Sequence, residues 1–343
     1  MQALLLTEYR KLELVTLDPP AIGPNDVLVR VAACGICGSD IHGYDGASGR
    51  RVPPIVMGHE AAGTVAEVGN AVNRAKVGDR VTFDSTIYCG HCDACRRGQV
   101  NLCPNRRVLG VSCSDYRQNG AFAEFVAVPQ HILYSLPPEL PFEHAAMIEP
   151  VSIALHAVAR LNVVQGERAV VVGSGMIGLL TIQALRIAGC CDVIAVDLDA
   201  SRLALAQQLG ASETLNPKQA DVAAAVFELT DGVGADIAVE AVGNAPALAT
   251  AIACVRRGGR VGLIGNLAAE VPFPLQSVVT RELTLVASCA SAGEYPRAIE
   301  LLASGAINVA PLISAIAPLA AGQEWFDRLH AIEPGLMKVI LQP

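Results

Sequence analysis

The stretch RAVVVGSGMIGLLTIQALRIAGCCDVIAVD, residues 168 to 197, constrains the fold more than any other part of the chain. Its apolar run VVV predicts a buried strand, and Gly173, Gly175 and Gly178 form a GxGxxG turn before an apolar helix and a second strand, VIAVD. Glycines in this pattern permit a tight turn and close approach of a pyrophosphate to the helix N-terminus. An acid, Asp197, ends the second strand 19 residues after Gly178. The combination predicts a parallel-sheet domain that binds a dinucleotide.

Asp197 also predicts which dinucleotide binds. A carboxylate at the end of the second strand accepts hydrogen bonds from the adenosine ribose and repels a 2′-phosphate, so NAD is favoured over NADP. Arg202 is the opposing feature, because its guanidinium could pair with such a phosphate. The segments ADIAVEAVG from residue 235 and GGRVGLIGN from residue 258 predict later strands whose carboxyl ends line the same crevice. The predicted coenzyme contacts are Gly173, Gly175, Ile177, Gly178, Asp197, Arg202, Ile264 and Gly265.

Length and charge narrow the class of protein. A chain of 343 residues with 52% hydrophobic residues predicts two domains with their own cores. Its formal net charge of −8 argues against nucleic acid or an anionic membrane as the main partner. The longest apolar stretch is interrupted by glycines, Gln183 and Arg186, which favours a buried strand and helix over a membrane span. The N-terminus carries no secretory signal pattern, so we expect a cytoplasmic protein.

Four cysteines lie close together in CGHCDACRRGQVNLC, residues 89 to 103. The 11 cysteines of a cytoplasmic chain are expected to stay reduced, so a tight cluster favours metal binding over disulfides. Four thiolates close a tetrahedral zinc shell, which predicts a structural rather than a catalytic ion. The alternative is an accidental cluster of free thiols, which would be reactive. The predicted structural ligands are Cys89, Cys92, Cys95 and Cys103.

A second set of metal ligands comes from three separate segments. CGICGSDIHGYDG, residues 34 to 46, supplies Cys37, and GHE, residues 58 to 60, supplies His59 and Glu60. One sulfur, one imidazole and one carboxylate are typical of a zinc site with an open position. Alternatively, Cys34 and Cys37 are a redox pair and His59 is an ordinary buried histidine. Glu149, a lone acid before Pro150 in an apolar stretch, is a further ligand candidate or a helix-start acid.

The N-terminal part of the chain has a different pattern from the dinucleotide-binding part. Short apolar runs such as DVLVRVAACG, AGTVAEVG and GDRVTF are separated by glycine, proline, asparagine and aspartate, which predicts a β-rich, barrel-like domain. Near the C-terminus, EYPRAIELLASGAI predicts an amphipathic helix and KVILQP a strand.

Together these motifs resemble the zinc-containing medium-chain dehydrogenase/reductase family over essentially the whole chain. GHEAAGTVAEVG resembles the family's GHE signature, and CGHCDACRRGQVNLC its structural-zinc lobe. MIEPVSIALHA is similar to the polyol (sorbitol or galactitol-phosphate) dehydrogenase branch. The resemblance implies an α/β protein with a GroES-like β-barrel catalytic domain and a Rossmann coenzyme domain with a doubly wound parallel sheet. The implied ranges are 1–154 and 291–343 for the first, with a zinc lobe at about 86–104, and 155–290 for the second.

The resemblance also assigns roles to single residues. Cys37, His59 and Glu60 would surround a catalytic zinc, and Glu149 would bind it directly or through water. Ser39 would pass on the substrate proton, and His42 would release it to solvent. Tyr44 stands where sorbitol dehydrogenases have a tyrosine that contacts substrate. The implied cofactors are NAD and two zinc ions per chain, one catalytic and one structural.

The implied activity is the oxidation of a secondary alcohol of a polyol, phosphorylated or not, to a ketone. One departure concerns the substrate, because Ala290 and Ser291 occupy the place of an Arg-Tyr pair found in sorbitol dehydrogenases. Threonine 3-dehydrogenase and butanediol-type activities use the same zinc and coenzyme and stay open, as does a non-catalytic protein built on a dehydrogenase scaffold. The expected partners are a small-molecule alcohol and further copies of the chain, in a homodimer or homotetramer.

Overall fold

The computed structural model describes residues 1–343 and divides the chain into two compact units. The predicted domain boundaries lie four or five residues away from the main boundaries of these units. The first unit contains Met1–Glu149, Tyr295–Gly305 and Val309–Pro343, and the second contains Pro150–Glu294 and Ala306–Asn308.

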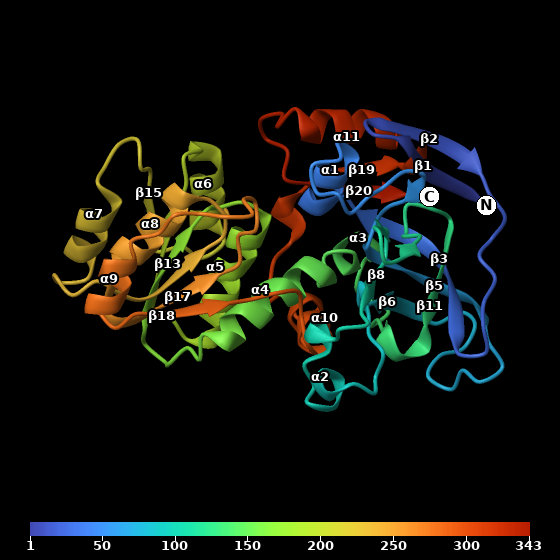
Figure 1. The fold of residues 1–343 in the computed structure, drawn as a ribbon, viewed down its shortest axis with the longest axis horizontal. Coiled ribbons are helices and arrows are strands. Elements are labelled where there is room, and N and C mark those ends of the chain that lie inside the picture. Colours follow the sequence, from blue (N-terminus) through green and yellow to red (C-terminus); the bar gives the residue numbers. More distant parts are fainter. The chain divides into compact units, whose positions relative to one another are not determined.

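The first unit is built around strand β3, Asp26–Gly35, whose apolar side chains are mostly buried. This strand pairs with β5 on one flank and, at its C-terminal end, with the last strand of the chain, β20. The main sheet has the order β12-β6-β5-β3-β20-β19, and β11 also pairs with β3. Figure 1 shows the last strands, in red, beside the N-terminal strands, in blue. The C-terminal segment therefore completes the sheet that the first third of the chain begins.

The strands of this unit are short, as the frequent turn residues predict. The strands are β1 (Gln2–Glu8), β2 (Lys11–Thr16), β3, β4 (Ile55–Val56), β5 (Glu60–Val68), β6 (Arg80–Phe83), β7 (Thr86–Ile87), β8 (Arg107–Val108), β9 (Val111–Ser112), β10 (Arg117–Gln118), β11 (Phe125–Pro129), β12 (Leu133–Ser135), β19 (Ile313–Pro318) and β20 (Lys338–Gln342). The helices are α1 (Gly38–Tyr44), α2 (Asp93–Arg96), α3 (Phe142–Ala145), α10 (Tyr295–Ala303) and α11 (Gly322–His330).

The second unit contains a parallel sheet of six strands in the order β15-β14-β13-β16-β17-β18. The order reverses between β14 and β16, on either side of β13, and this switch is where open α/β sheets bind ligands. Strand β13 is almost entirely buried because it is covered on both faces, which explains its continuous apolar run. Figure 1 labels β13, β15, β17 and β18 of this sheet, together with the helices of the unit.

The elements of the second unit alternate between strand and helix. The strands are β13 (Arg168–Val172), β14 (Asp192–Val196), β15 (Glu213–Leu215), β16 (Ala235–Glu240), β17 (Val255–Leu263) and β18 (Thr284–Ala287). The helices are α4 (Ile148–Arg160), which begins in the first unit, α5 (Met176–Ala188), α6 (Ala200–Gln208), α7 (Val222–Leu229), α8 (Ala245–Cys254) and α9 (Leu275–Thr280).

The apolar stretch that raised the question of a membrane span is divided between two elements. Its first part forms β13 and its second part forms α5, with Gly173 and Gly175 between them. None of the helices combines the length and the apolar character that a membrane crossing requires.

Candidate active site

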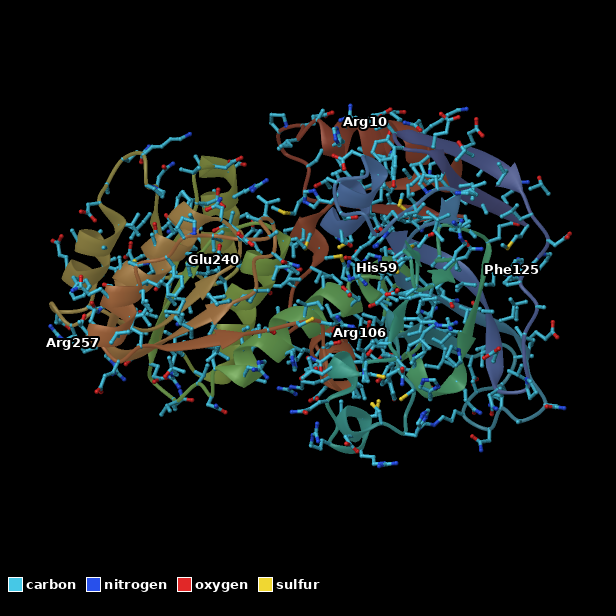
Figure 2. The ribbon with its side chains drawn as sticks, in the orientation of Figure 1. Arg10, His59, Arg106, Phe125, Glu240 and Arg257 are labelled. Atoms are coloured by element: carbon cyan, nitrogen blue, oxygen red, sulfur yellow. The ribbon has the colours of Figure 1, made fainter.

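Three candidate zinc ligands meet where strand β3 ends and strand β5 begins. Gly35, the last residue of β3, is paired with Glu60, the first residue of β5. This pairing brings Cys37 close to His59 and Glu60, so that one ligand atom from each lies within 4.8 Å of the other two. His59 and Glu60 are buried, whereas Cys37 is partly exposed (Figure 2 labels His59). A thiolate, an imidazole and a carboxylate at this spacing suit zinc and leave room for a further ligand.

Asp40, in the interior of the protein, contacts both His59 and Arg51. Asp40 is fully buried, and one of its carboxylate oxygens lies 3.4 Å from His59 Nδ1 and 3.4 Å from Arg51 Nη2. Burial alone would raise the pKa of Asp40, but His59 and Arg51 outweigh it and lower that pKa to about 2. The permanent negative charge behind His59 favours the orientation in which Nε2 faces away from Asp40, toward a metal.

Glu149 lies in the first turn of α4, close to this group but not within it. Ser85 Oγ donates a hydrogen bond of 3.3 Å to Glu149 Oε1. Burial raises the pKa of Glu149 to about 7, and the neighbouring carboxylates of Glu60 and Asp84 act in the same direction. The carboxylate is not among the three ligand atoms that lie within 4.8 Å of one another. Of the two predicted acids, Glu60 is therefore the one placed beside Cys37 and His59.

The two residues predicted to move a proton both lie on helix α1. Ser39 is exposed, and its Oγ lies 3.4 Å from His59 Nε2, the nitrogen that would face a metal. His42 is also exposed and follows three residues later, in the last turn of the helix. Residues three apart lie on the same face of a helix, so the two side chains share one face of α1.

The four cysteines of the lobe after β7 also form a tight group. Their sulfur atoms all lie within 4.8 Å of one another, with Cys92 Sγ and Cys95 Sγ 3.4 Å apart. In the metal-free chain, the backbone N–H of His91 is the main reason that the pKa of Cys89 falls to about 6, whereas burial and then Cys92 raise the pKa of Cys95 to about 12. Thiols this close cannot all ionise unless a cation compensates their charge. The donor set therefore fits zinc in a closed shell.

The predicted dinucleotide turn has the backbone that the glycine pattern requires. Gly173 has φ +100°, a conformation that other residues rarely adopt, and a Cβ on Gly178 would overlap the carbonyl oxygen of Gly173. Gly175, the N-cap of α5, faces open space. Asp197, which directly follows β14, accepts a hydrogen bond of 2.7 Å from the backbone N–H of Ser174. The acid and the turn are thus joined at the end of the sheet where a dinucleotide would bind.

Comparisons with known proteins agree with this geometry. The family described as alcohol dehydrogenase GroES-like domain matches residues 23–138, and the family described as zinc-binding dehydrogenase matches residues 177–304. Sorbitol dehydrogenase of Bacillus subtilis (strain 168) is 35% identical over 100% of this chain and 97% of its own length. D-arabitol-phosphate dehydrogenase of Enterococcus avium is 36% identical, over 97% of this chain and 94% of its own.

The chain belongs to the zinc-dependent alcohol dehydrogenase family. A protein described as a zinc-binding dehydrogenase from Sinorhizobium meliloti 1021, whose crystal structure contains NADP, has a TM-score of 0.90 and 33% identity, covering 100% of this chain and 99% of its own. The predicted family, fold class and oxidoreductase class are confirmed.

Within this dehydrogenase, Tyr44 is not placed as a substrate contact. It is 1% exposed, and its ring packs against Phe326. Its hydroxyl donates to the carbonyl oxygen of Arg10 at 2.7 Å or to Asp327 Oδ1 at 2.6 Å, and accepts from Gln323. The hydroxyl thus joins α1 to α11, and this geometry gives no support to the substrate contact predicted for Tyr44.

Two buried charged residues of the dehydrogenase were not predicted from the sequence. Lys338, the first residue of β20, contacts Glu60 in the zinc site. Glu240, at the end of β16, accepts hydrogen bonds from the backbone N–H groups of Val242 (2.8 Å) and Gly243 (2.7 Å). A Cβ on Gly265 would overlap the backbone of Gly243 and the Glu240 carboxylate, so the two loops that follow β16 and β17 lie in close contact around Glu240 (Figure 2 labels Glu240). In the sequence, each of these two residues is marked only by a charge at the edge of an apolar strand.

Ala290 and Ser291, which stand where sorbitol dehydrogenases have an Arg-Tyr pair, lie near the end of the second unit's main segment. Ala290 adopts φ +53°, and the side chain of Ser291 is 3% exposed. Neither residue offers the cation and phenol of the pair found in sorbitol dehydrogenases. Any polyol recognition by this enzyme must therefore use other groups.

Proposed function

We propose that this enzyme oxidises a secondary hydroxyl group of a polyol or polyol phosphate to a ketone, with NAD as the acceptor. The observation that carries the proposal is the group of Cys37, His59 and Glu60, with Ser39 directly beside the imidazole. The names of the two relatives, a sorbitol and an arabitol-phosphate dehydrogenase, support a polyol substrate.

In this proposal, different residues bind the metal and move the proton. Cys37 and His59 would hold the zinc, with Glu60 or Glu149 as the carboxylate ligand. When bound, zinc supplies positive charge that favours ionisation of the substrate hydroxyl, and the nicotinamide accepts a hydride. Ser39 would take up the hydroxyl proton, and the 3.4 Å distance between its oxygen and His59 Nε2 supports this role. His42 would pass the proton to solvent, since its imidazole is exposed and can both accept and donate a proton.

The preference for NAD rests on Asp197. Its carboxylate is held beside the glycine turn by Ser174, so a 2′-phosphate would meet a fixed negative charge. The relative from Sinorhizobium meliloti binds NADP, which makes coenzyme choice a property to be measured for this chain. Arg202, three residues beyond the helix cap Asp199, is the group that would favour NADP.

The test is NADH formation by the zinc-loaded enzyme, followed by absorbance. The substrate panel contains polyols, polyol phosphates, threonine and 2,3-butanediol, and each is offered with NAD and with NADP. We expect turnover of a polyol or polyol phosphate with NAD, and its loss in Cys37→Ser. Turnover of threonine or butanediol alone would overturn the polyol assignment, and activity in Cys37→Ser would overturn the zinc assignment.

Assembly and location complete the proposal. We propose a cytoplasmic homodimer or homotetramer, on the basis of the family resemblance. Light scattering of the purified enzyme measures the oligomeric state, and a monomer at working concentration would contradict it.

A further inference from the structure

Lys338 is a further charged residue that lies beside a candidate zinc ligand, Glu60. Its side chain is 3% exposed, and its Nζ lies 2.5 Å from Glu60 Oε2. The same ammonium donates a hydrogen bond of 3.0 Å to the carbonyl oxygen of Ile36. Both members of the pair are almost fully buried, and a buried ammonium is tolerated only when it is paired in this way.

The backbone fixes the position of this lysine. Strand β20 begins at Lys338 and pairs with the end of β3, where Ile340 lies opposite Gly35. Gly35 in turn lies opposite Glu60. A side chain on Gly35 would overlap Glu60 Oε2 and contact the stem of Lys338. The space between the two strands is therefore shaped for this one ion pair.

One carboxylate is thus shared between two cations when zinc is present. Zinc would draw Glu60 toward Cys37 and His59, while the ammonium retains Oε2 through its 2.5 Å contact. A carboxylate with one oxygen engaged can give only the other to a metal, whereas a free carboxylate can chelate with both. A chelating Glu60 would fill the position that a substrate hydroxyl needs, because catalytic zinc sites use three protein ligands and keep one position open.

We propose that Lys338 is a positioning residue that restrains Glu60 to at most one zinc-ligating oxygen and so keeps a coordination position open for substrate. This inference rests on the proposed function, since it assigns a role within the same zinc site. The two predicted acids then have different roles: Glu60 is a ligand restrained by Lys338, and Glu149 is a separate carboxylate that accepts a hydrogen bond from Ser85.

Cobalt substitution tests the restraint without any assay of activity. Co²⁺ is exchanged into the wild type, Lys338→Met and Lys338→Arg, and the visible absorption is recorded. The intensity of these bands falls when four-coordinate cobalt becomes five-coordinate. The four-cysteine lobe is unchanged between the variants, so its absorption cancels in the difference spectrum. We expect weaker bands and slower loss of cobalt to a chelator in Lys338→Met, and a spectrum close to the wild type in Lys338→Arg.

Kinetics give a second, independent readout. Changes in groups that hold metal ligands typically cost about 10- to 100-fold in activity, and we expect a loss of that size in kcat/KM for Lys338→Met. The KM for NAD should stay unchanged, because the coenzyme turn is remote in sequence and untouched. Lys338→Leu serves if the methionine variant fails to fold, since it also removes both the donor and the charge.

The outcomes separate this inference from the proposed function. An unchanged cobalt spectrum and chelator rate in Lys338→Met or Lys338→Leu overturn the restraint, even if stability falls, because a purely structural lysine would act that way. A changed spectrum in a protein whose wild type oxidises no polyol supports the restraint and counts against the substrate assignment alone.

Discussion

The carboxylate of Asp197 and the backbone N–H of Ser174 are joined by a 2.7 Å hydrogen bond that connects the end of β14 to the glycine turn after β13. The other carboxylate oxygen accepts the backbone N–H of Asp199 at 2.9 Å. These two bonds fix the charge at the place where the adenosine ribose of a dinucleotide would lie. Coenzyme preference should therefore depend on the charge of this single side chain.

We expect Asp197→Asn to weaken NAD binding and to reduce the discrimination against NADP. A hydrogen bond to a charged group contributes about 1.5–3 kcal/mol, so KM for NAD should rise by roughly 10- to 100-fold. Initial rates with both coenzymes measure the effect. Asp192→Asn, at the opposite end of β14, is the matched control and should leave the KM for NAD unchanged. An unaltered ratio of NAD to NADP activity in Asp197→Asn would show that another residue selects the coenzyme.

Tyr44→Phe should lower stability without changing substrate binding. The substitution removes a buried hydroxyl that bonds Asp327 and Arg10, and the loss of such a group costs about 1–3 kcal/mol. We expect a lower melting temperature and an unchanged KM for the alcohol. A large increase in that KM, with stability preserved, would restore Tyr44 as a substrate contact.

The sequence predicted best what its local patterns determine. The turn of Gly173 to Gly178 and the cluster that ends at Cys103 each lie within one short segment, so spacing alone indicated their geometry. The pair of Lys338 and Glu60 could not be found in this way, because 278 residues separate the two. Only the pairing of β20 with β3 brings them together, and a lysine at the start of an apolar strand does not indicate such a pairing.

Tyr44 illustrates a different limit. Its position next to the proton-relay residues on α1 suggested a shared site, but one short helix presents different faces to different neighbours. The hydroxyl meets Asp327, 283 residues further along the chain, on a helix whose location the sequence pattern did not specify. Helix register relative to distant elements is set by packing rather than by the local sequence.

Cys95→Ser should destabilise the lobe and leave the coenzyme unit intact. The four sulfur atoms lie within 4.8 Å of one another, so the loss of one opens the closed zinc shell. A loss of about 2 kcal/mol lowers the melting temperature by roughly 4–8 °C in a unit of this size. Cys191→Ser, at an exposed thiol outside the cluster, is the control and should melt like the wild type. Equal melting temperatures and two zinc ions per chain in both variants would contradict a structural role.

The partly buried carboxylate of Asp236 gives a pH-dependent prediction. Asp236 accepts the backbone N–H of Arg168 at 2.9 Å and the Nε of Arg256 at 2.7 Å. Burial alone would raise the pKa of Asp236, but these two donors outweigh it, so its pKa lies below the ordinary value. A carboxyl group whose pKa is lowered by folding stabilises the protein above its unfolded pKa of about 3.9. That stabilisation is lost as the pH falls through the lower, folded value.

Asp236→Asn should therefore lower the urea midpoint at pH 7, by an amount corresponding to about 2 kcal/mol. The difference from the wild type should stay constant down to about pH 5 and shrink below about pH 4, where the wild-type carboxylate begins to take up protons. Asp192→Asn is the matched control, because Asp192 faces Arg168 at 3.6 Å with a side chain that is 46% exposed. Such an exposed pair contributes at most about 1 kcal/mol, so this variant should unfold almost like the wild type at every pH. A destabilisation by Asp236→Asn that persisted unchanged into acid would mean that side-chain shape, rather than charge, holds Arg168 and Arg256 in place.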